Sequence, residues 1–138
     1  MKKRIAIIGS TGSIGKSLLS ILNSEKQNIE ILLLTANKSY KLLLKQAKKF
    51  KVRNLIITNK TSFNIANKIK KNSKIRIYND FNSLNKILTK KVDYTMSSII
   101  GINGLEPTIK LIKHSKKIAI ANKESIICGW NLIKKELK

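Results

Sequence analysis

The stretch KRIAIIGSTGSIGKSLLSIL, residues 3–22, decides the fold of this chain of 138 residues. Its first part, Arg4 to Ile8, is a short apolar run typical of a buried strand, and Ile14 to Asn23 has the apolar spacing of a helix. Three glycines at positions 9, 12 and 15 lie around the junction. Glycines at such a turn allow a tight bend and a close approach of backbone N–H groups to an anion. The helix is expected to place these residues on its inner side: Ile14, Leu18, Leu19, Ile21 and Leu22.

Apolar runs and helical patterns alternate along the rest of the chain. Because the runs are continuous in Ile, Leu and Val rather than alternating with polar residues, they indicate a parallel sheet covered on both faces. The sequence therefore predicts a single Rossmann-like, doubly wound α/β domain over residues 1–138. Further strands are expected at Ile29 to Thr35, Leu55 to Thr58, Lys74 to Tyr78, Asp93 to Ser98 and Lys117 to Ala121. Further helices are expected at Ser39 to Phe50, Thr61 to Lys71, Ser83 to Leu88, Glu106 to about His114, and from Glu124 onward.

The chain is strongly basic, with 29 Lys and Arg against 7 Asp and Glu and a formal charge of +22. Only three of these bases are Arg, the residue that grips phosphate bidentately, so a nucleic-acid-binding module is the weaker alternative. Lys, Ile and Asn together make up 64 residues, and their codons can be written mainly in A and T. We therefore interpret the basic segments as solvated faces of a bacterial protein from an AT-rich genome. These segments are Lys45 to Lys51, Lys68 to Lys74 and Lys116 to Lys117.

The cysteine count and the hydropathy restrict the cellular compartment and the kinds of site that the chain can have. The single Cys128 excludes an internal disulfide and any Cys-based zinc site, which fits a reducing cytoplasm. No apolar run approaches the length of a membrane span, so no membrane partner is expected. Cys128 is expected to be a small core residue, and the only histidine, His114, to lie structurally in the last turn of a helix.

The segment Thr35-Ala36-Asn37-Lys38-Ser39 follows the second expected strand. NAD sites usually carry an acid there for the ribose 2′-hydroxyl, whereas NADP sites need donors or a cation for the 2′-phosphate. With one cation and no acid, the segment favours NADP(H). A polar loop that caps the next helix through Ser39 explains it equally well, and both can hold at once.

The segment Ala121-Asn122-Lys123-Glu124-Ser125 follows the last expected strand. Ligands of this fold sit at the carboxyl edge of the sheet, so Asn122 and Lys123 would face the same crevice as the glycine turn. Alternatively, Asn122 caps the helix and Glu124 completes its acidic first turn. The residues alone leave these two interpretations level.

Three motifs together resemble one family: GSTGSIG at 9–15, SSIIGINGL at 97–105 and ANKES at 121–125. This family is 1-deoxy-D-xylulose 5-phosphate reductoisomerase, which uses NADPH to convert that sugar phosphate to 2-C-methyl-D-erythritol 4-phosphate in non-mevalonate isoprenoid biosynthesis. The resemblance implies that Thr11, Gly12, Ser13 and Ile14 bind the NADPH pyrophosphate. It further implies Lys38 at the 2′-phosphate, Asn122 and Glu124 at the cofactor, and Lys123 at the substrate. Asn37 and Ser39 are kept as phosphate-binding positions on the argument from the second strand.

The chain departs from the family in composition and in length. The family often has Gly at position 37 and Asn at 39, and small residues where Trp130 stands. Its members are well over twice as long, and their carboxylates for Mn or Mg lie beyond Lys138, so we expect neither a catalytic residue nor a metal site in this part. Asp80, Asp93, Glu106 and Glu124 are scattered among Lys and Asn. The chain alone is expected to bind NADPH without turnover and to be monomeric, whereas the full-length family is homodimeric. Another GxxGxxG NADP-dependent reductase, such as a semialdehyde dehydrogenase, is the alternative enzyme.

Overall fold

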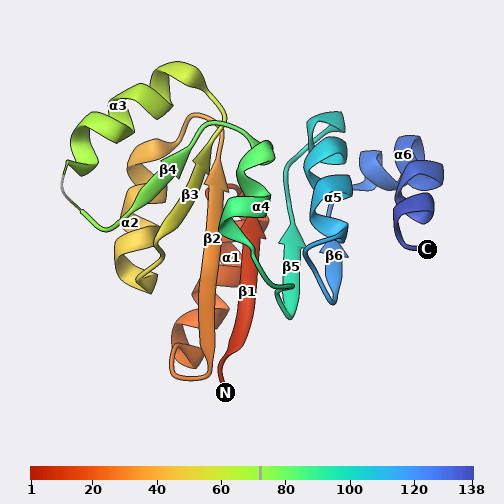
Figure 1. Ribbon diagram of the computed structural model, residues 1–138, viewed down its shortest axis with the longest axis horizontal. Coiled ribbons are helices and arrows are strands. Elements are labelled where there is room, and N and C mark those ends of the chain that lie inside the picture. Colours follow the sequence, from red (N-terminus) through yellow and green to blue (C-terminus); the bar gives the residue numbers. More distant parts are fainter. Residues whose placement is uncertain (72) are drawn as a thin grey trace.

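The computed structural model describes residues 1–71 and 73–138, and these form one six-stranded, wholly parallel sheet with helices on both faces (Figure 1). This confirms the α/β class predicted from the apolar runs. The strands are β1 (Lys3–Ile8), β2 (Ile29–Ala36), β3 (Asn54–Ile57), β4 (Arg76–Tyr78), β5 (Tyr94–Ser97) and β6 (Ile118–Ile120). The α-helices are α1 (Ser13–Leu22), α2 (Tyr40–Phe50), α3 (Lys60–Lys70), α4 (Leu84–Ile87), α5 (Leu105–Ile112) and α6 (Lys123–Glu136). Short 3-10 turns occupy η1 (Asn23–Glu25), η2 (Phe81–Ser83) and η3 (Ile102–Gly104).

The strand order β4-β3-β2-β1-β5-β6 places a topological switch point beside β1. Strands β2, β3 and β4 are added in succession on one side of β1. The chain then crosses back, and β5 pairs with the other side of β1, where Ile8 lies opposite Ser97. In open parallel sheets the loops that leave two strands at such a point diverge and leave a crevice at their carboxyl ends. We call this end of the sheet the carboxyl edge and the opposite end, where the N-terminus lies in Figure 1, the amino edge.

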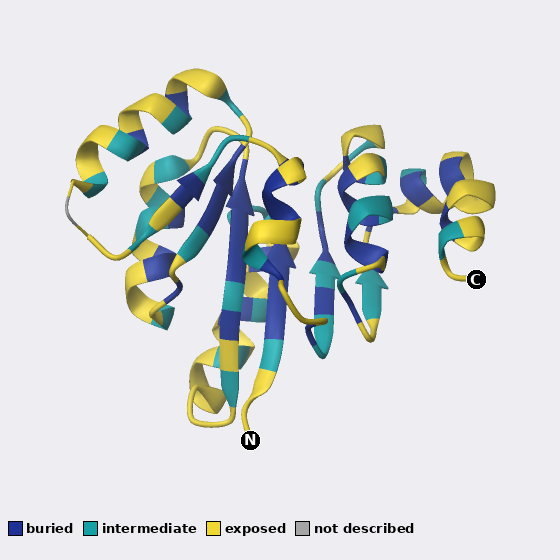
Figure 2. Ribbon diagram, viewed as in Figure 1, coloured by how far each residue is buried: buried dark blue, intermediate teal, exposed yellow. Residues whose placement is uncertain are grey.

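Two apolar cores cover the two faces of the sheet. On one face, Leu19 of α1, Leu43 of α2 and Ala66 of α3 pack against strand residues such as Ile7 and Leu34. On the other, Leu84 of α4 and Leu111 of α5 pack against Ala6, Ile8 and Leu33. Successive residues of β1 therefore alternate between the two cores, which is why its run of apolar residues is continuous. Figure 2 shows the buried strands between helices whose outer sides are exposed.

Some side chains lie elsewhere than the sequence predicts. Ile14 and Ile21 of α1 were expected inside, yet 44% and 67% of their surfaces are exposed. The helix buries only a narrow stripe around Gly15 and Leu19, so the prediction for these two isoleucines is wrong.

Helix α6 packs against the rest of the protein with a different face than expected. Cys128, expected in the core, is exposed, because the residue that faces α5 is its neighbour Gly129. A Cβ at Gly129 would overlap the side chain of Leu105. Trp130 is 47% exposed, so its bulk lies outside this contact and the packing of α6 does not depend on a small residue there.

Helix α5 ends at Ile112, so His114 lies in the turn after the helix rather than in its last turn. Its backbone N–H donates to the carbonyl of Leu111, and its own carbonyl accepts from Val92. Within the described part of the chain, no helix combines the length and the apolar character that crossing a bilayer requires.

A candidate nucleotide-binding groove

The turn between β1 and α1 is bent by Gly9, whose φ of +80° is unfavourable for residues with a Cβ. The Gly9 N–H donates to Thr35 Oγ1 of β2 over 2.9 Å, and the Gly12 N–H donates to the Gly9 carbonyl over 3.2 Å. Ser10 is fully buried and exchanges hydrogen bonds with Gln46 of α2. These bonds hold the turn in place at the end of β1, so that the N-terminus of α1 is fixed beside the switch point.

Among the described residues, no side chain forms a cap hydrogen bond at the N-terminus of α1. Its N-cap is Gly12, which has no side chain, and the first turn contains no acidic residue. In contrast, α3 and α6 are capped by the side chains of Asn59 and Asn122. The first N–H groups of a helix have no intrahelical acceptor and carry a partial positive charge. Together with the nearby hydroxyl of Ser13, which is exposed, this donor set fits a pyrophosphate.

An open groove of about 770 Å³ lies along the carboxyl edge. It contains Thr11 and Gly12 from the first turn and Asn37 from the end of β2, so the structure brings together parts of two predicted sites. Ser98, Ile99 and Ile100, from the loop after β5, also line it. Ser98 Oγ donates to the carbonyls of Ile8 and Gly9, which fixes this loop to the glycine turn. The complete lining is Gly9, Thr11, Gly12, Thr35, Ala36, Asn37, Thr58, Asn79, Asp80, Phe81, Asn82, Ser98, Ile99, Ile100, Asn103, Glu106, Pro107 and Lys110.

The segment after β2 stands at one end of the groove. Asn37 Nδ2 donates to Thr58 Oγ1 over 2.7 Å, and the Asn37 carbonyl accepts from the N–H of Asn59. Lys38 and Ser39 are exposed beyond the lining residues. Ser39 occupies the N-cap of α2 without any side-chain cap hydrogen bond, so the predicted capping through its hydroxyl is wrong. Asn37 has a negative φ, so Asn at this position needs no left-handed backbone.

The start of α6 is joined to the groove through Asn122. This side chain is 4% exposed, and its Oδ1 accepts from the N–H of Ser125 over 2.9 Å, which confirms the predicted cap. Its Nδ2 donates to the carbonyls of Ile99 and Gly101 in the loop after β5. Asn122 therefore holds a wall of the groove, whereas Lys123 is exposed and Glu124 half-exposed in the first turn of α6. Ser13, Ile14, Asn122, Lys123 and Glu124 are not among the lining residues.

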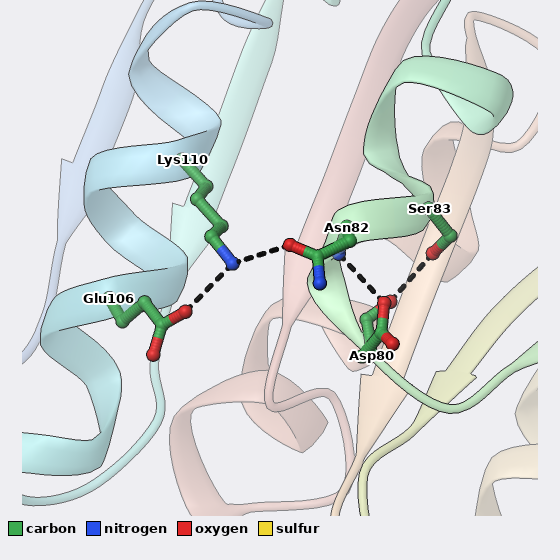
Figure 3. Close-up of polar contacts among 5 residues, drawn as sticks. All are labelled: Asp80, Asn82, Ser83, Glu106 and Lys110. Carbon is green, nitrogen blue, oxygen red and sulfur yellow. Dashed lines mark hydrogen bonds and ion pairs between the residues drawn. The ribbon is translucent and has the colours of Figure 1, made fainter.

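Further residues that line the groove come from the loop after β4 and from α5, and the sequence did not indicate them (Figure 3). Lys110 of α5 donates to Glu106 Oε1 at 2.7 Å and to Asn82 Oδ1 at 2.9 Å. The Asn82 N–H in turn donates to Asp80 Oδ1, which joins the loop after β4 to α5. The available signal was the position of Asn79 and Asp80 directly after a strand, equivalent to that of Asn37 after β2.

A metal site does not fit the residues at hand. In the described ranges, no group of three or more His, Cys, Asp or Glu side chains comes close enough together to hold a metal ion. Glu106 is paired with Lys110, and Asp80 accepts from the backbone of its own turn.

Comparison with known proteins agrees with this geometry. The family model described as 1-deoxy-D-xylulose 5-phosphate reductoisomerase matches residues 5–129. The chain belongs to this family. The reductoisomerase of Pelagibacter ubique is 58% identical over 138 residues, which are 99% of this chain and 36% of that protein. The reductoisomerase of Clostridium tetani is 35% identical over 97% of this chain and 36% of its own length. The chain thus spans about a third of the length of these reductoisomerases.

Solved reductoisomerase structures share the fold. The enzyme from Zymomonas mobilis in complex with NADPH superposes with a TM-score of 0.89 at 28% identity, over 99% of this chain and 36% of that one. A reductoisomerase in complex with NADPH, fosmidomycin and magnesium superposes with a TM-score of 0.87 at 27% identity, over 98% of this chain and 34% of that one. The predicted family and Rossmann-like fold are confirmed.

Proposed function

We propose that this chain is the NADPH-binding domain of a 1-deoxy-D-xylulose 5-phosphate reductoisomerase. One observation carries the proposal: the uncapped N-terminus of α1 lies beside a groove at the switch point of the sheet. Family membership and the two NADPH complexes with the same fold support it. The alternative of a different GxxGxxG reductase does not account for these matches.

Each predicted site residue receives a role in the proposal. Thr11, Gly12, Ser13 and Ile14 bind the pyrophosphate through hydroxyl and backbone N–H donors. Asn37, Lys38 and Ser39 bind the 2′-phosphate, with Lys38 as the cation. Asn122 and Glu124 belong to the nicotinamide end, where Asn122 acts through the Ile99–Gly101 loop that it holds. Lys123 is assigned to the phosphate-bearing substrate.

The cofactor, when bound, supplies a hydride; the chain's own residues bind and orient it. The N–H groups of α1 hold the pyrophosphate. The Asn82–Lys110 contact joins two of the segments that line the groove, and the buried Ser10–Gln46 pair keeps the glycine turn rigid. We assign the metal, the remaining catalytic groups and a homodimer interface to regions of the reductoisomerase that residues 1–138 do not supply. We further propose that the enzyme is cytoplasmic and uses manganese or magnesium.

The test is cofactor preference. We expect the purified chain to bind NADPH at least tenfold more tightly than NADH, measured by fluorescence titration, and to show no turnover. Lys38→Glu should reduce that preference by roughly tenfold or more, because a carboxylate repels the 2′-phosphate and accepts from a 2′-hydroxyl. Lys48→Glu, the same charge change in the last turn of α2, should leave the preference intact. Equal affinity for the two nucleotides, or affinity for neither, would contradict the proposal.

A further inference from the structure

A second, strongly basic surface begins at the amino edge and extends along α2 toward Lys16 near the start of α1. A hollow of about 640 Å³ at the amino edge is lined by the starts of β2 and β3 and by the end of α2. A smaller hollow of about 280 Å³ lies between α1 and α2 and shares Lys49 and Phe50 with the first. We call their cations the basic track. The basic track consists of Lys2, Lys16, Lys26, Lys45, Lys49, Lys51 and Arg53.

These cations are concentrated beyond what a uniformly Lys-rich surface would give. The two hollows have eighteen lining residues in all, of which seven are cationic and one, Glu30, is acidic. The nucleotide groove also has eighteen lining residues, but only Lys110 is cationic, and it stands with Asp80 and Glu106. Codon bias inflates Lys at exposed positions regardless of location, so it does not explain this contrast between the two surfaces.

The cations of the basic track form no ion pair among the residues that the structure describes. All seven side chains belong to exposed residues. The ion pairs found among the described residues join Lys110, Lys113 and Lys116 to acids, and none includes a member of the track. The carboxyl end of α2 contributes only about half a negative charge near Lys49. Seven cations and one acid, Glu30, around two joined hollows thus produce a net positive field.

The shape of the track favours an extended ligand. It runs from the amino edge, along α2, to Lys16, whose backbone N–H bonds Gly12 at the glycine turn. Eleven residues of α2 correspond to roughly 16 Å of helix at about 1.5 Å per residue. A single phosphate would reach only part of the track, whereas a chain of phosphates can neutralise all of it.

The aromatic chemistry argues against a nucleobase. The ammonium groups of Lys26 and Lys49 lie 5.0 and 5.8 Å from the centroid of the Phe50 ring, so this ring already holds two cations. Of the described residues, Phe50 alone contributes an aromatic ring to either hollow, and sequence-tolerant binding of single strands relies on free aromatic faces. Arg53 is the only Arg of the track. We propose that the basic track binds a linear chain of closely spaced phosphates, of the inorganic polyphosphate type, independently of NADPH.

The experiment compares two triple variants of the chain by titration with long-chain inorganic polyphosphate at about 0.15 M salt. The track variant is Lys26→Gln, Lys49→Gln, Arg53→Gln. The matched control is Lys134→Gln, Lys135→Gln, Lys138→Gln, which removes three exposed cations from the opposite end of the molecule. We expect the track variant to lose roughly tenfold or more in affinity and to show a shallower salt dependence, and the control to lose no more than about twofold. Lys26→Arg with Lys49→Arg keeps the charge and should keep the affinity, which separates loss of charge from loss of fold.

Three outcomes would overturn the proposal. Equal losses in both triple variants would mean that net charge alone attracts the polymer. Displacement of polyphosphate by saturating NADPH would place it in the nucleotide groove. Equal or tighter binding of a charge-matched oligothymidine, lost in the track variant, would assign the surface to nucleic acid. Because the track variant keeps Lys38 and the glycine turn, failure of NADPH binding is detected separately.

Discussion

The groove at the carboxyl edge and the basic track differ in the kind of group that they offer to an anion. At the carboxyl edge, the groove has one Lys and two acids among its lining residues, and the donors we assign to an anion there are the N–H groups of α1, which have no side-chain cap. Along the basic track, which runs from the amino edge beside α2 toward the start of α1, the positive field comes from seven side chains. Fixed backbone donors suit a ligand of defined geometry, whereas long, flexible ammonium groups suit an anion of variable shape. Position in the fold, rather than the number of lysines, is therefore the basis on which we propose the nucleotide site.

Gly15→Ala should give the largest effect, because it breaks the carboxyl edge itself. A Cβ at Gly15 would lie 2.5 Å from Ser10 Cα and 2.8 Å from its carbonyl carbon, both backbone atoms that cannot move aside. Forcing atoms into such a packed site should cost about 3 kcal/mol of unfolding free energy, measured by urea denaturation.

The matched control is Gly12→Ala, three residues earlier in the same turn. A Cβ there meets only the Gly9 carbonyl at 3.5 Å, an ordinary contact, and the φ of −78° suits any residue. Its unfolding free energy should change by less than about 1 kcal/mol. If the two substitutions destabilise the chain equally, the turn is not held against Ser10 as the structure shows.

The sequence predicted those features that depend on local pattern. Continuous apolar runs such as Ile5 to Ile8 indicated buried strands, and Gly9 to Gly15 indicated the turn, because both signals lie within a few neighbouring residues. Ile14 and Ile21 were misplaced because the helix has more apolar residues than its buried stripe accommodates. Cys128 was misplaced because the phase of α6 is set by the Gly129–Leu105 contact, which is not local.

The contact between Asn82 and Lys110 in the lining of the groove could not be predicted for a similar reason. Asn82 and Lys110 are 28 residues apart, and they meet because β4 lies at one end of the sheet while its following loop passes back toward α5. That path depends on strand order, which apolar periodicity does not encode. Asn122 was predicted both as a cap and as a site residue; the cap is confirmed, and the cofactor contact stays a prediction.

Asn122→Ala should give the second-largest effect and tests how the groove is held. The substitution removes the α6 cap, in which Asn122 accepts from the Ser125 N–H. It also removes both donations to the loop after β5, so the half-buried carbonyls of Ile99 and Gly101 lose this partner. We expect a loss of about 2 kcal/mol in unfolding free energy. A severalfold loss of NADPH affinity should accompany it, because Ile99 and Ile100 of this loop line the groove.

Asn59→Ala is the control for Asn122→Ala, since Asn59 caps α3 by accepting from the Ser62 N–H at 3.0 Å and makes no bond to that loop. It should cost about 1 kcal/mol and leave NADPH affinity unchanged. Equal effects of the two substitutions on affinity would show that Asn122 acts only as a helix cap.

Asp93→Asn should give the smallest change in stability, and it tests how much a single ion pair at the amino edge contributes. The Asp93 carboxylate accepts from the Arg4 backbone N–H at 2.9 Å and from Lys116 Nζ at 2.7 Å, and these bonds lower its pKa from 3.8 to about 2. Because the folded pKa lies below the unfolded one, the stabilisation is complete above about pH 4 and is lost as pH falls toward 2. Asp93→Asn should therefore be slightly less stable than the parent at pH 7, with the difference vanishing near pH 2 and shrinking in high salt. Glu30→Gln, an exposed acid at the same edge, provides the comparison in thermal melts across this range. A stability difference for Asp93→Asn that does not change with pH would mean that Asp93 contributes through its hydrogen-bonding shape rather than through its charge.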